Sequence, residues 1–341
     1  MKKLIKIFIS VFVIVIIGSA ASFYYLYFPM DRGDEKVVLV IERGTSLSAV
    51  ANYLEENQVI TSSKALIAWM KLSGRDKKIQ AGQFEFRQGQ GALSVSEGLL
   101  NAQQIEVRVT VLEGLTVEQT AQRIASVIDI DTTKFIAICY DTNVVRELGI
   151  KDAPSLEGYL FPDTYHFPED ASERSIINRM VSRFKQLYKT LEGDSALVSK
   201  YSRHELLTVA SIVEKEATLA SERGKIAGVF HNRLIKGYPL GADPTVRYIF
   251  RKFDGPLYVS ELNVDNPYNT RRFAGIPPGP ICSPGLGAIQ ATLTPDSTDA
   301  LYFVAKWDGT GAHDFSRTYR EHNRKKLHYR RQNELRKQRG E

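Results

Sequence analysis

The longest uninterrupted apolar stretch lies near the N-terminus, where residues 7–28 carry no charged side chain. A helix of this length spans about 33 Å, slightly more than the roughly 30 Å hydrocarbon core of a bilayer. Lysines within the first six residues precede the stretch and an aromatic cluster at 24–28 closes it. The pattern predicts a single-pass transmembrane helix at 7–28 in the cytoplasmic membrane, with residues 1–6 in the cytoplasm and everything after residue 31 extracytoplasmic.

A cleaved signal peptide is the competing interpretation, because residues 18–21 are small and follow an apolar core of suitable length. The apolar run continues for seven residues beyond that point, which favours an anchor over a cleaved peptide. No later segment reaches eighteen uncharged apolar residues, so one span is predicted.

After a polar linker at 31–36, residues 37–105 alternate as in a small α+β unit. The expected elements are a strand at 37–41, a helix from 47, a helix from 62 or 63 whose apolar positions include Leu72, a strand at 82–86 and a helix from 94. No acids, histidines or nucleophiles cluster here, so the pattern indicates a binding or positioning module. A second α+β domain is predicted for 106–341, beginning with an alternating strand at 106–111.

Composition supports a folded protein with an unusual tail. Hydrophobic residues make up 43% of the chain and charged residues 25%. The net charge of +6 comes from residues 317–341, where ten Lys and Arg face three Glu. A basic tail of this kind can face RNA, an anionic membrane surface or simply water. The only cysteines, Cys139 and Cys282, are too far apart for a CxxC metal site, although a disulfide between them stays possible.

The densest candidate chemistry lies in the helical segment 205–217, which ends in Glu214-Lys215-Glu216-Ala217. On a helical wheel Glu216 falls at the edge of the apolar face and Lys215 points the opposite way. Desolvation and the negative end of the helix dipole would both raise the pKa of Glu216, as a general acid requires. The wheel favours Glu216 over Glu214 only slightly, and an ordinary amphipathic helix with a charged end has the same pattern.

A second unusual segment, residues 156–165, interleaves aromatic residues with Glu157 and Asp163 in a loop that contains Gly and Pro. Aromatic rings beside polar groups are typical of sugar-binding grooves. A packed corner with a few polar caps would have the same composition.

Farther along, the chain contains ASIVEKEA, SER, HNRL, ADPTV, PYNT, GIPPGPI and an LYFVA strand in this order. With these motifs, and with its single N-terminal span, the sequence resembles the endolytic murein transglycosylase family (MltG, also called YceG-like). The resemblance implies a LysM-like module at 37–105, a catalytic domain at 106–341 and Glu216 as the catalytic acid/base. In one departure, Ala217 stands where lytic transglycosylases usually carry Ser or Thr, which puts in doubt a role for a neighbouring hydroxyl.

The family reaction cleaves the MurNAc-β-1,4-GlcNAc bond within a glycan strand without water as the acceptor. The resemblance implies that Glu216 protonates the leaving oxygen and then removes the proton from the C6 hydroxyl of the same MurNAc, giving a 1,6-anhydro end. One carboxyl group does both jobs, whereas most glycoside hydrolases need two.

The polar residues expected to orient the strand lie in these motifs and in the 156–165 loop. They are Tyr159, Asp163, Glu222, Asn232, Arg233, Asp243, Thr245, Tyr268 and Asn269. Structural alternatives are that Glu222 pairs with Arg233, that Asp243 caps the turn at Pro244 and that Asn269 holds a loop. His231 and His313 lack a partner at metal-ligand spacing and are interpreted as structural.

The expected partners are peptidoglycan strands and the synthases that make them, without nucleic acid, cofactor or metal. Two hypotheses from other classes remain: a membrane-anchored peptidoglycan-binding protein in which Glu216 is dispensable, and a cytosolic RNA binder that uses the basic tail. The RNA binder requires that residues 7–28 do not insert into a membrane.

Overall fold

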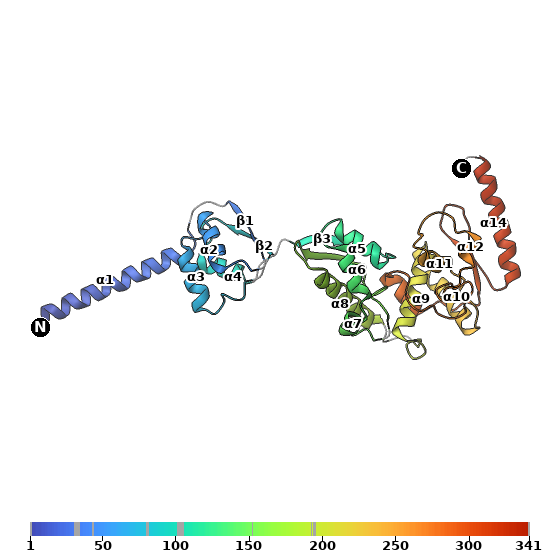
Figure 1. The fold of residues 1–341 in the computed structure, drawn as a ribbon, viewed down its shortest axis with the longest axis horizontal. Coiled ribbons are helices and arrows are strands. Elements are labelled where there is room, and N and C mark those ends of the chain that lie inside the picture. Colours follow the sequence, from blue (N-terminus) through green and yellow to red (C-terminus); the bar gives the residue numbers. More distant parts are fainter. Residues whose placement is uncertain are drawn as a thin grey trace. The chain divides into compact units, whose positions relative to one another are not determined.

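The computed structural model describes residues 2–30, 35–42, 44–79, 82–100, 106–151, 153–191, 193 and 196–339. The chain divides into two compact units, one made of 1–108 and 166–170 and the other of 109–165 and 171–341. Many helices are combined with small two-stranded sheets, which confirms the α+β class (Figure 1). Most of the predicted linker, 31–34, and the expected end of the first module, 101–105, lie outside the described residues.

The first unit begins with helix α1 (Lys2–Tyr27), whose C-terminal end packs on the module that follows: the rings of Tyr27 and Trp69 lie 6.0 Å apart. Within the described part of the chain, no helix combines the length and apolar character needed to cross a membrane. The predicted span at 7–28 therefore stays a prediction.

The module itself contains β1 (Lys36–Ile41), α2 (Leu47–Glu56), α3 (Ser63–Leu72), β2 (Gly82–Arg87) and α4 (Ala92–Gly98). β1 and β2 pair antiparallel, with Leu39 opposite Phe84 on the buried face. Alternate burial along both strands explains the alternating sequence. Leu72 is an exception to the expected apolar set: it ends α3 and is 85% exposed, because the last turn extends beyond the core.

The second unit is mostly helical. Its elements are β3 (Glu106–Thr110), α5 (Val117–Ala125), α6 (Thr132–Tyr140), α7 (Thr142–Glu147), β4 (Thr164–Pro168), α8 (Glu173–Leu191), α9 (Arg203–Glu216), the 3-10 turn η2 (Ala220–Glu222), α10 (Arg223–Ile235), α11 (Asp243–Ile249), α12 (Val259–Leu262), α13 (Leu286–Leu293), β5 (Tyr302–Ala305), β6 (His313–Ser316) and α14 (Tyr319–Arg339). The sheets are β3–β4 and an antiparallel β5–β6 pair. The division between the units passes through β3 and β4.

Helix α9 is the centre of the second unit. It starts at a capping box formed by Ser202 and Glu205. All residues from Leu206 to Val213 are buried, so the helix is enclosed on every side rather than along the single apolar face that the wheel predicted. Thr208 and Ser211 are tolerated inside because each hydroxyl donates to a backbone carbonyl of the same helix, at 2.7 Å.

The segment 278–285 runs along α9 in the same direction and is hydrogen-bonded to it at three levels. His204 Nε2 lies 2.9 Å from the Pro278 carbonyl oxygen, the Ile281 amide donates to Ser211, and the Gly285 amide donates to Glu214. The segment 278–285, which begins in the GIPPGPI motif and extends beyond it, therefore braces the helix that carries Glu216 from its first turn to its last.

Candidate active site at the C-terminal end of α9

Glu216 is the last residue of α9, and the chain turns to an extended conformation at Ala217. Its side chain is partly buried. Among the described residues none forms a hydrogen bond or ion pair with it, so its carboxyl group stays available to a ligand. Burial raises the pKa of Glu216 from 4.5 to about 7, with a further upward contribution from the charge of Asp243 and an opposing one from Arg233.

Arg233 and Asp243 therefore adjust the same carboxyl group in opposite directions. Arg233 comes from α10 and is held by backbone oxygens: its Nε donates to Leu301 at 2.6 Å and its Nη1 donates to Leu240. Its guanidinium also stacks over Tyr302, 5.1 Å from the ring centroid. Backbone carbonyls and an aromatic ring carry no negative charge, so these contacts do not neutralise the guanidinium. Arg233 can therefore stabilise the Glu216 carboxylate once the proton has left.

Glu214, the other acid of the motif, serves the structure instead. Its Oε2 accepts the Gly285 amide at 3.1 Å, at the N-terminus of α13, and its Oε1 lies 3.5 Å from Arg223. Only 8% of the side chain is exposed. Gly285 also lies against the side chain of Glu113, which binds Arg223 as well, so a Cβ at position 285 would displace the Glu113 carboxyl group. These contacts distinguish the role of Glu214 from that of Glu216, which the helical wheel could not do.

Several other predicted residues hold the loops around Glu216. Asn232 donates to the carbonyls of Thr298 and Ala300, which positions the chain before β5. Asn269 is fully buried and donates to the carbonyls of Leu262 and Val264. The geometry thus fits the structural alternative for Asn269, that it holds a loop, and its expected contact with substrate stays a prediction.

Asp243 and Thr245 lie at the start of α11. Asp243 pairs with Arg271 at 2.6 Å, while Ala242 rather than Asp243 occupies the cap position. The buried Thr245 hydroxyl donates to Ala242 and lies 3.0 Å from the hydroxyl of Thr270. Tyr268 is partly buried, with its ring centroid 5.2 Å from that of Tyr248, and burial raises its pKa. Of this group, Asp243 is the one whose charge is coupled to Glu216.

Glu222 does not pair with Arg233, the arrangement considered from the sequence. Its Oε2 lies 2.8 Å from Nδ1 of His313, and its carboxylate also accepts the His313 amide. Both residues line a cavity of about 480 Å³ together with Lys225 and Asp314. Nearby, Gly311 lies against Thr218, which joins the β5–β6 hairpin to the residues just after Glu216. Glu216 is not among the residues that line this cavity.

Tyr159 and Asp163 lie away from Glu216. Tyr159 is buried beside His204, at the opposite end of α9, and twelve helical residues separate His204 from Glu216 by about 18 Å. Asp163 accepts from Arg183 at 2.7 Å and from the Thr164 amide. The structure therefore brings Glu216, Arg233 and Asp243 together but places these two in a different region.

Sequence reasoning did not single out Glu157 as an unusual acid. It is 2% exposed, accepts the Val117 amide at the start of α5 and accepts the Tyr248 hydroxyl at 3.2 Å. Burial raises the pKa of Glu157 to about 8, aided by the charge of Glu118. Its partners lie 40 and 91 residues away, so only its place among aromatic residues could have drawn attention to it.

No cluster of metal-ligating side chains occurs in the described parts of the chain. Cys139 and Cys282 are both buried free thiols, so the disulfide left open by the sequence is not formed. His231 packs its ring 6.0 Å from that of Tyr201.

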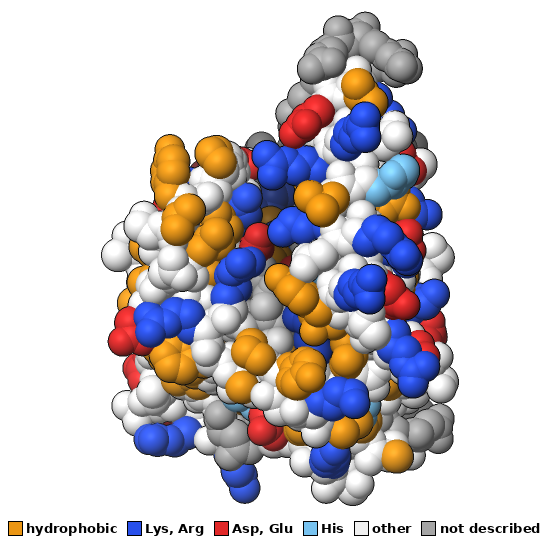
Figure 2. Space-filling model, turned by 90° about the vertical axis from the view of Figure 1, so that its right-hand side faces the viewer, with side chains coloured by type: hydrophobic (Ala, Val, Ile, Leu, Met, Phe, Trp, Pro, Cys, Tyr) orange, Lys and Arg blue, Asp and Glu red, His pale blue; other side chains and the backbone are white. Residues whose placement is uncertain are grey.

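The basic C-terminal segment forms α14, along which Lys and Arg side chains gather on the face shown in Figure 2. Lys325 and Tyr329 of this helix bind Asp314 of β6, which fastens α14 to the hairpin beside the candidate site.

Comparison with known proteins identifies similar chains. The sequence matches the YceG-like family over residues 39–328. It is 36% identical to an endolytic murein transglycosylase of Bacillus subtilis, over 92% of this chain and 91% of that protein. An endolytic murein transglycosylase of Streptococcus pneumoniae is 27% identical, and the match covers 88% of this chain but 61% of that longer protein. The fold is similar to the crystal structure of a putative yceG-like protein from Listeria monocytogenes, with a TM-score of 0.59 and 31% identity over 86% of this chain and 99% of that one.

Proposed function

Because the chain belongs to the YceG-like family, we propose that it is an endolytic murein transglycosylase in which Glu216 is the acid and then the base. One observation carries the assignment: Glu216 is a partly exposed residue whose pKa is raised to about 7 and whose carboxyl group has no hydrogen-bond partner among the described residues. The other acid of the motif, Glu214, is occupied at the start of α13.

In the proposed reaction, protonated Glu216 donates its proton to the glycosidic oxygen as the MurNAc C1–O bond breaks. The C6 hydroxyl oxygen of the same MurNAc then bonds to C1, and the Glu216 carboxylate accepts its proton. The product carries a 1,6-anhydro end and the acid is restored without water being consumed. Arg233 favours the carboxylate in the second half and Asp243 favours the protonated form in the first.

The test is a digest of purified murein sacculi with the full chain, followed by mass analysis of the fragments. Anhydro-ended internal fragments support the proposal, whereas ends that have gained water would identify a muramidase instead. An absence of cleavage by well-folded protein would favour the non-catalytic binding hypothesis.

The first unit supports the same proposal as a positioning module. A cavity of about 240 Å³ lies between the loop after β1 and the loop after α3, lined by Glu42, Thr45, Asp76 and Lys77 together with Ile41, Leu47 and Ile79. A lining that combines polar and apolar side chains suits a sugar ring. We assign glycan binding by the LysM-like module to this cavity.

The anchor is part of the proposal as well. Apolar side chains of α1, such as Phe12, Ile14 and Ile17, are 60%, 67% and 62% exposed, which suits a lipid environment. With the lysine-rich end in the cytoplasm, the residues after the span would lie outside, where cleavage would accompany or terminate strand synthesis beside peptidoglycan synthases. Proteolysis of intact spheroplasts tests this: digestion of the residues after the span by external protease supports the anchor, and full protection would favour a cytosolic protein.

A further inference from the structure

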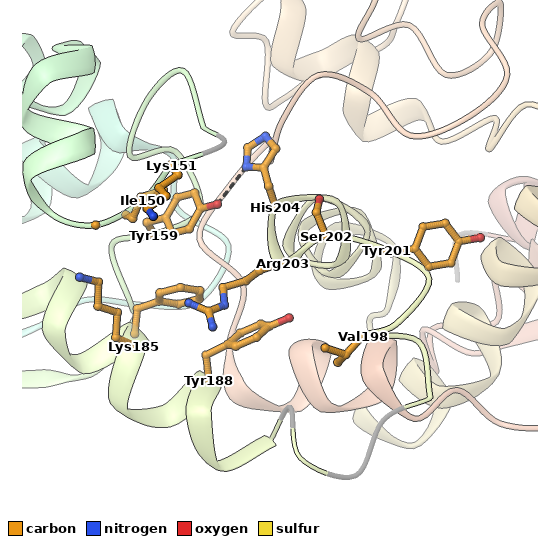
Figure 3. Close-up of a pocket in the computed structure, with 12 residues that line it drawn as sticks. Ile150, Lys151, Tyr159, Lys185, Tyr188, Val198, Tyr201, Ser202, Arg203 and His204 are labelled. Carbon is orange, nitrogen blue, oxygen red and sulfur yellow. Dashed lines mark hydrogen bonds between the residues drawn. The ribbon is translucent and has the colours of Figure 1, made fainter.

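A second cavity of the larger unit lies at the first turn of α9, far from Glu216. Its volume is about 390 Å³, and its walls come from the loop after α7, the C-terminal half of α8 and the residues that enter α9 (Figure 3). His204 at this end and Glu216 at the other are about 18 Å apart along the helix. The proposed cleavage chemistry therefore does not use this cavity.

The ionisable side chains that line the cavity are basic or neutral. Lys151, Lys185 and Arg203 contribute positive charge, and the lining residues that the structure describes include no Asp or Glu. Within the described residues, Lys151 and Lys185 form neither a hydrogen bond nor an ion pair with the rest of the chain. The ammonium of Lys185 lies over Gly149, whose φ of +66° and missing side chain leave room for it. Two lysines that no described acidic residue pairs with favour an anionic ligand.

The rest of the wall is aromatic and already arranged. The ring of Tyr159 packs edge-on against Phe184 at 5.1 Å, and Arg203 stacks over Tyr188 with 5.0 Å to the ring centroid. Because the Pro278 carbonyl can only accept, Nε2 of His204 donates to it, and Nδ1 lies 2.9 Å from the Tyr159 hydroxyl oxygen. The polar atoms of Tyr159 and His204 thus face each other and the bracing segment, which leaves recognition to the cations and the ring faces.

We propose that the cavity binds a carboxylate group of a short peptide, namely the peptide stem that a murein strand carries on MurNAc. This step rests on the proposed function. Sugar hydroxyls alone have no need of two unpaired ammonium groups. A stem combines carboxylates for the lysines with small apolar side chains for Phe184 and Ile150. A compact phosphate would use the charge but not the apolar wall.

Such a site would control which strands are cut. A stem held at one end of α9 fixes the register of the strand relative to Glu216 at the other end. The segment 278–285, bonded to His204 at its start and to Glu214 at its end, keeps the two ends at a constant separation. The cavity would therefore select strands that carry peptides and place the scissile bond by its distance from a stem.

Binding to the full-length Glu216→Gln chain, in detergent, tests the proposal without cleavage. The probes for calorimetry are the tripeptide L-Ala-γ-D-Glu-L-Lys, the same peptide with both carboxylates amidated, and inorganic phosphate. We expect the free acid to bind at least tenfold more tightly than either the diamide or phosphate. Lys185→Glu should weaken binding of the acid by tenfold or more. Lys189→Glu, the same change one turn along α8 and outside the cavity, should leave it unaltered.

Three results would overturn the proposal: no binding of the free acid, equal binding of the diamide, or equal losses from the two lysine substitutions. Tighter binding of phosphate would transfer the site to a phosphate-bearing ligand and also refute a peptide stem. The proposed function is judged separately by the sacculus digest with the unsubstituted chain. Peptide binding without cleavage would refute the function alone, and cleavage without peptide binding would refute this site alone.

Discussion

Glu157 and Glu216 are two carboxyl groups of the same unit whose pKa values are both raised by burial, to about 8 and about 7. Their surroundings differ in every other respect. Glu157 is 2% exposed and accepts hydrogen bonds from Val117 and Tyr248, so it joins the start of α5 to α11. Glu216 ends α9, is partly exposed and has no hydrogen-bond partner among the described residues.

The difference shows what a raised pKa does and does not indicate. Desolvation keeps a proton on either carboxyl group near neutral pH. Only a group with a free oxygen and access from outside can pass that proton to a substrate. Glu157 is the more strongly shifted acid, but its oxygens are already committed to an amide and a hydroxyl. We therefore assign proton transfer to Glu216 and a structural role to Glu157.

The largest expected effect separates the two by activity. Glu216→Gln keeps the shape of the side chain but removes the transferable proton, so murein cleavage should fall at least about 100-fold. Glu157→Gln, the matched control, should change the rate only a few-fold, because an amide oxygen can still accept the Val117 amide. Release of anhydro-ended fragments measures both. The reverse ranking would exchange the roles assigned to the two glutamates.

The second effect separates them by stability. Glu157→Ala leaves the Val117 amide and the Tyr248 hydroxyl without their acceptor in a buried place, which should cost about 2–4 kcal/mol of unfolding free energy. Glu216→Ala removes no hydrogen bond within the described residues and should cost well under that at pH 5. Urea denaturation of both variants at pH 5 provides the measurement. Equal losses would mean that Glu216 also has a structural role.

The third effect is the pH dependence of stability. The folded state holds the Glu216 proton more tightly than the unfolded chain does, because the pKa of Glu216 is 4.5 in the unfolded chain and about 7 in the folded state. The contribution of protonated Glu216 to the free energy of unfolding is therefore fully present below pH 4.5, and it is lost as the pH rises towards about 7. Relative to the unsubstituted chain, Glu216→Gln should gain about 1–3 kcal/mol between pH 4.5 and pH 8. For Glu157→Gln the gain in unfolding free energy relative to the unsubstituted chain should continue up to about pH 8, because the pKa of Glu157 is about 8. Urea midpoints measured across this pH range test the argument. A difference between either variant and the unsubstituted chain that does not change with pH would contradict it.

Part of this comparison was predictable from the sequence and part was not. Local pattern was enough for the α+β class, for the alternating strands of the first module and for a helix that ends at Glu216. The choice between Glu214 and Glu216 was not local, because it depends on the Gly285 amide, 71 residues from Glu214. The same holds for Asn232, whose bonds to Thr298 and Ala300 span more than sixty residues and cannot be seen as periodicity.

The smallest expected effect tests how Glu216 is tuned. If protonated Glu216 is the acid, kcat/KM for murein should decline above pH 7, and the midpoint of that decline should follow the charges nearby. Asp243→Asn removes the negative charge that raises the pKa of Glu216, so the midpoint should move to lower pH. The shift should be a few tenths of a unit, because the Asp243 side chain is 53% exposed and solvent screens it.

Arg271 supplies the control of opposite sign. It pairs with Asp243 at 2.6 Å and partly neutralises it. Arg271→Gln should therefore strengthen the effect of Asp243 on Glu216 and move the midpoint to higher pH. Added salt should shrink both shifts, since both act through charges near the surface. Shifts of the same sign in the two variants would show that loop rearrangement, rather than charge, sets the midpoint.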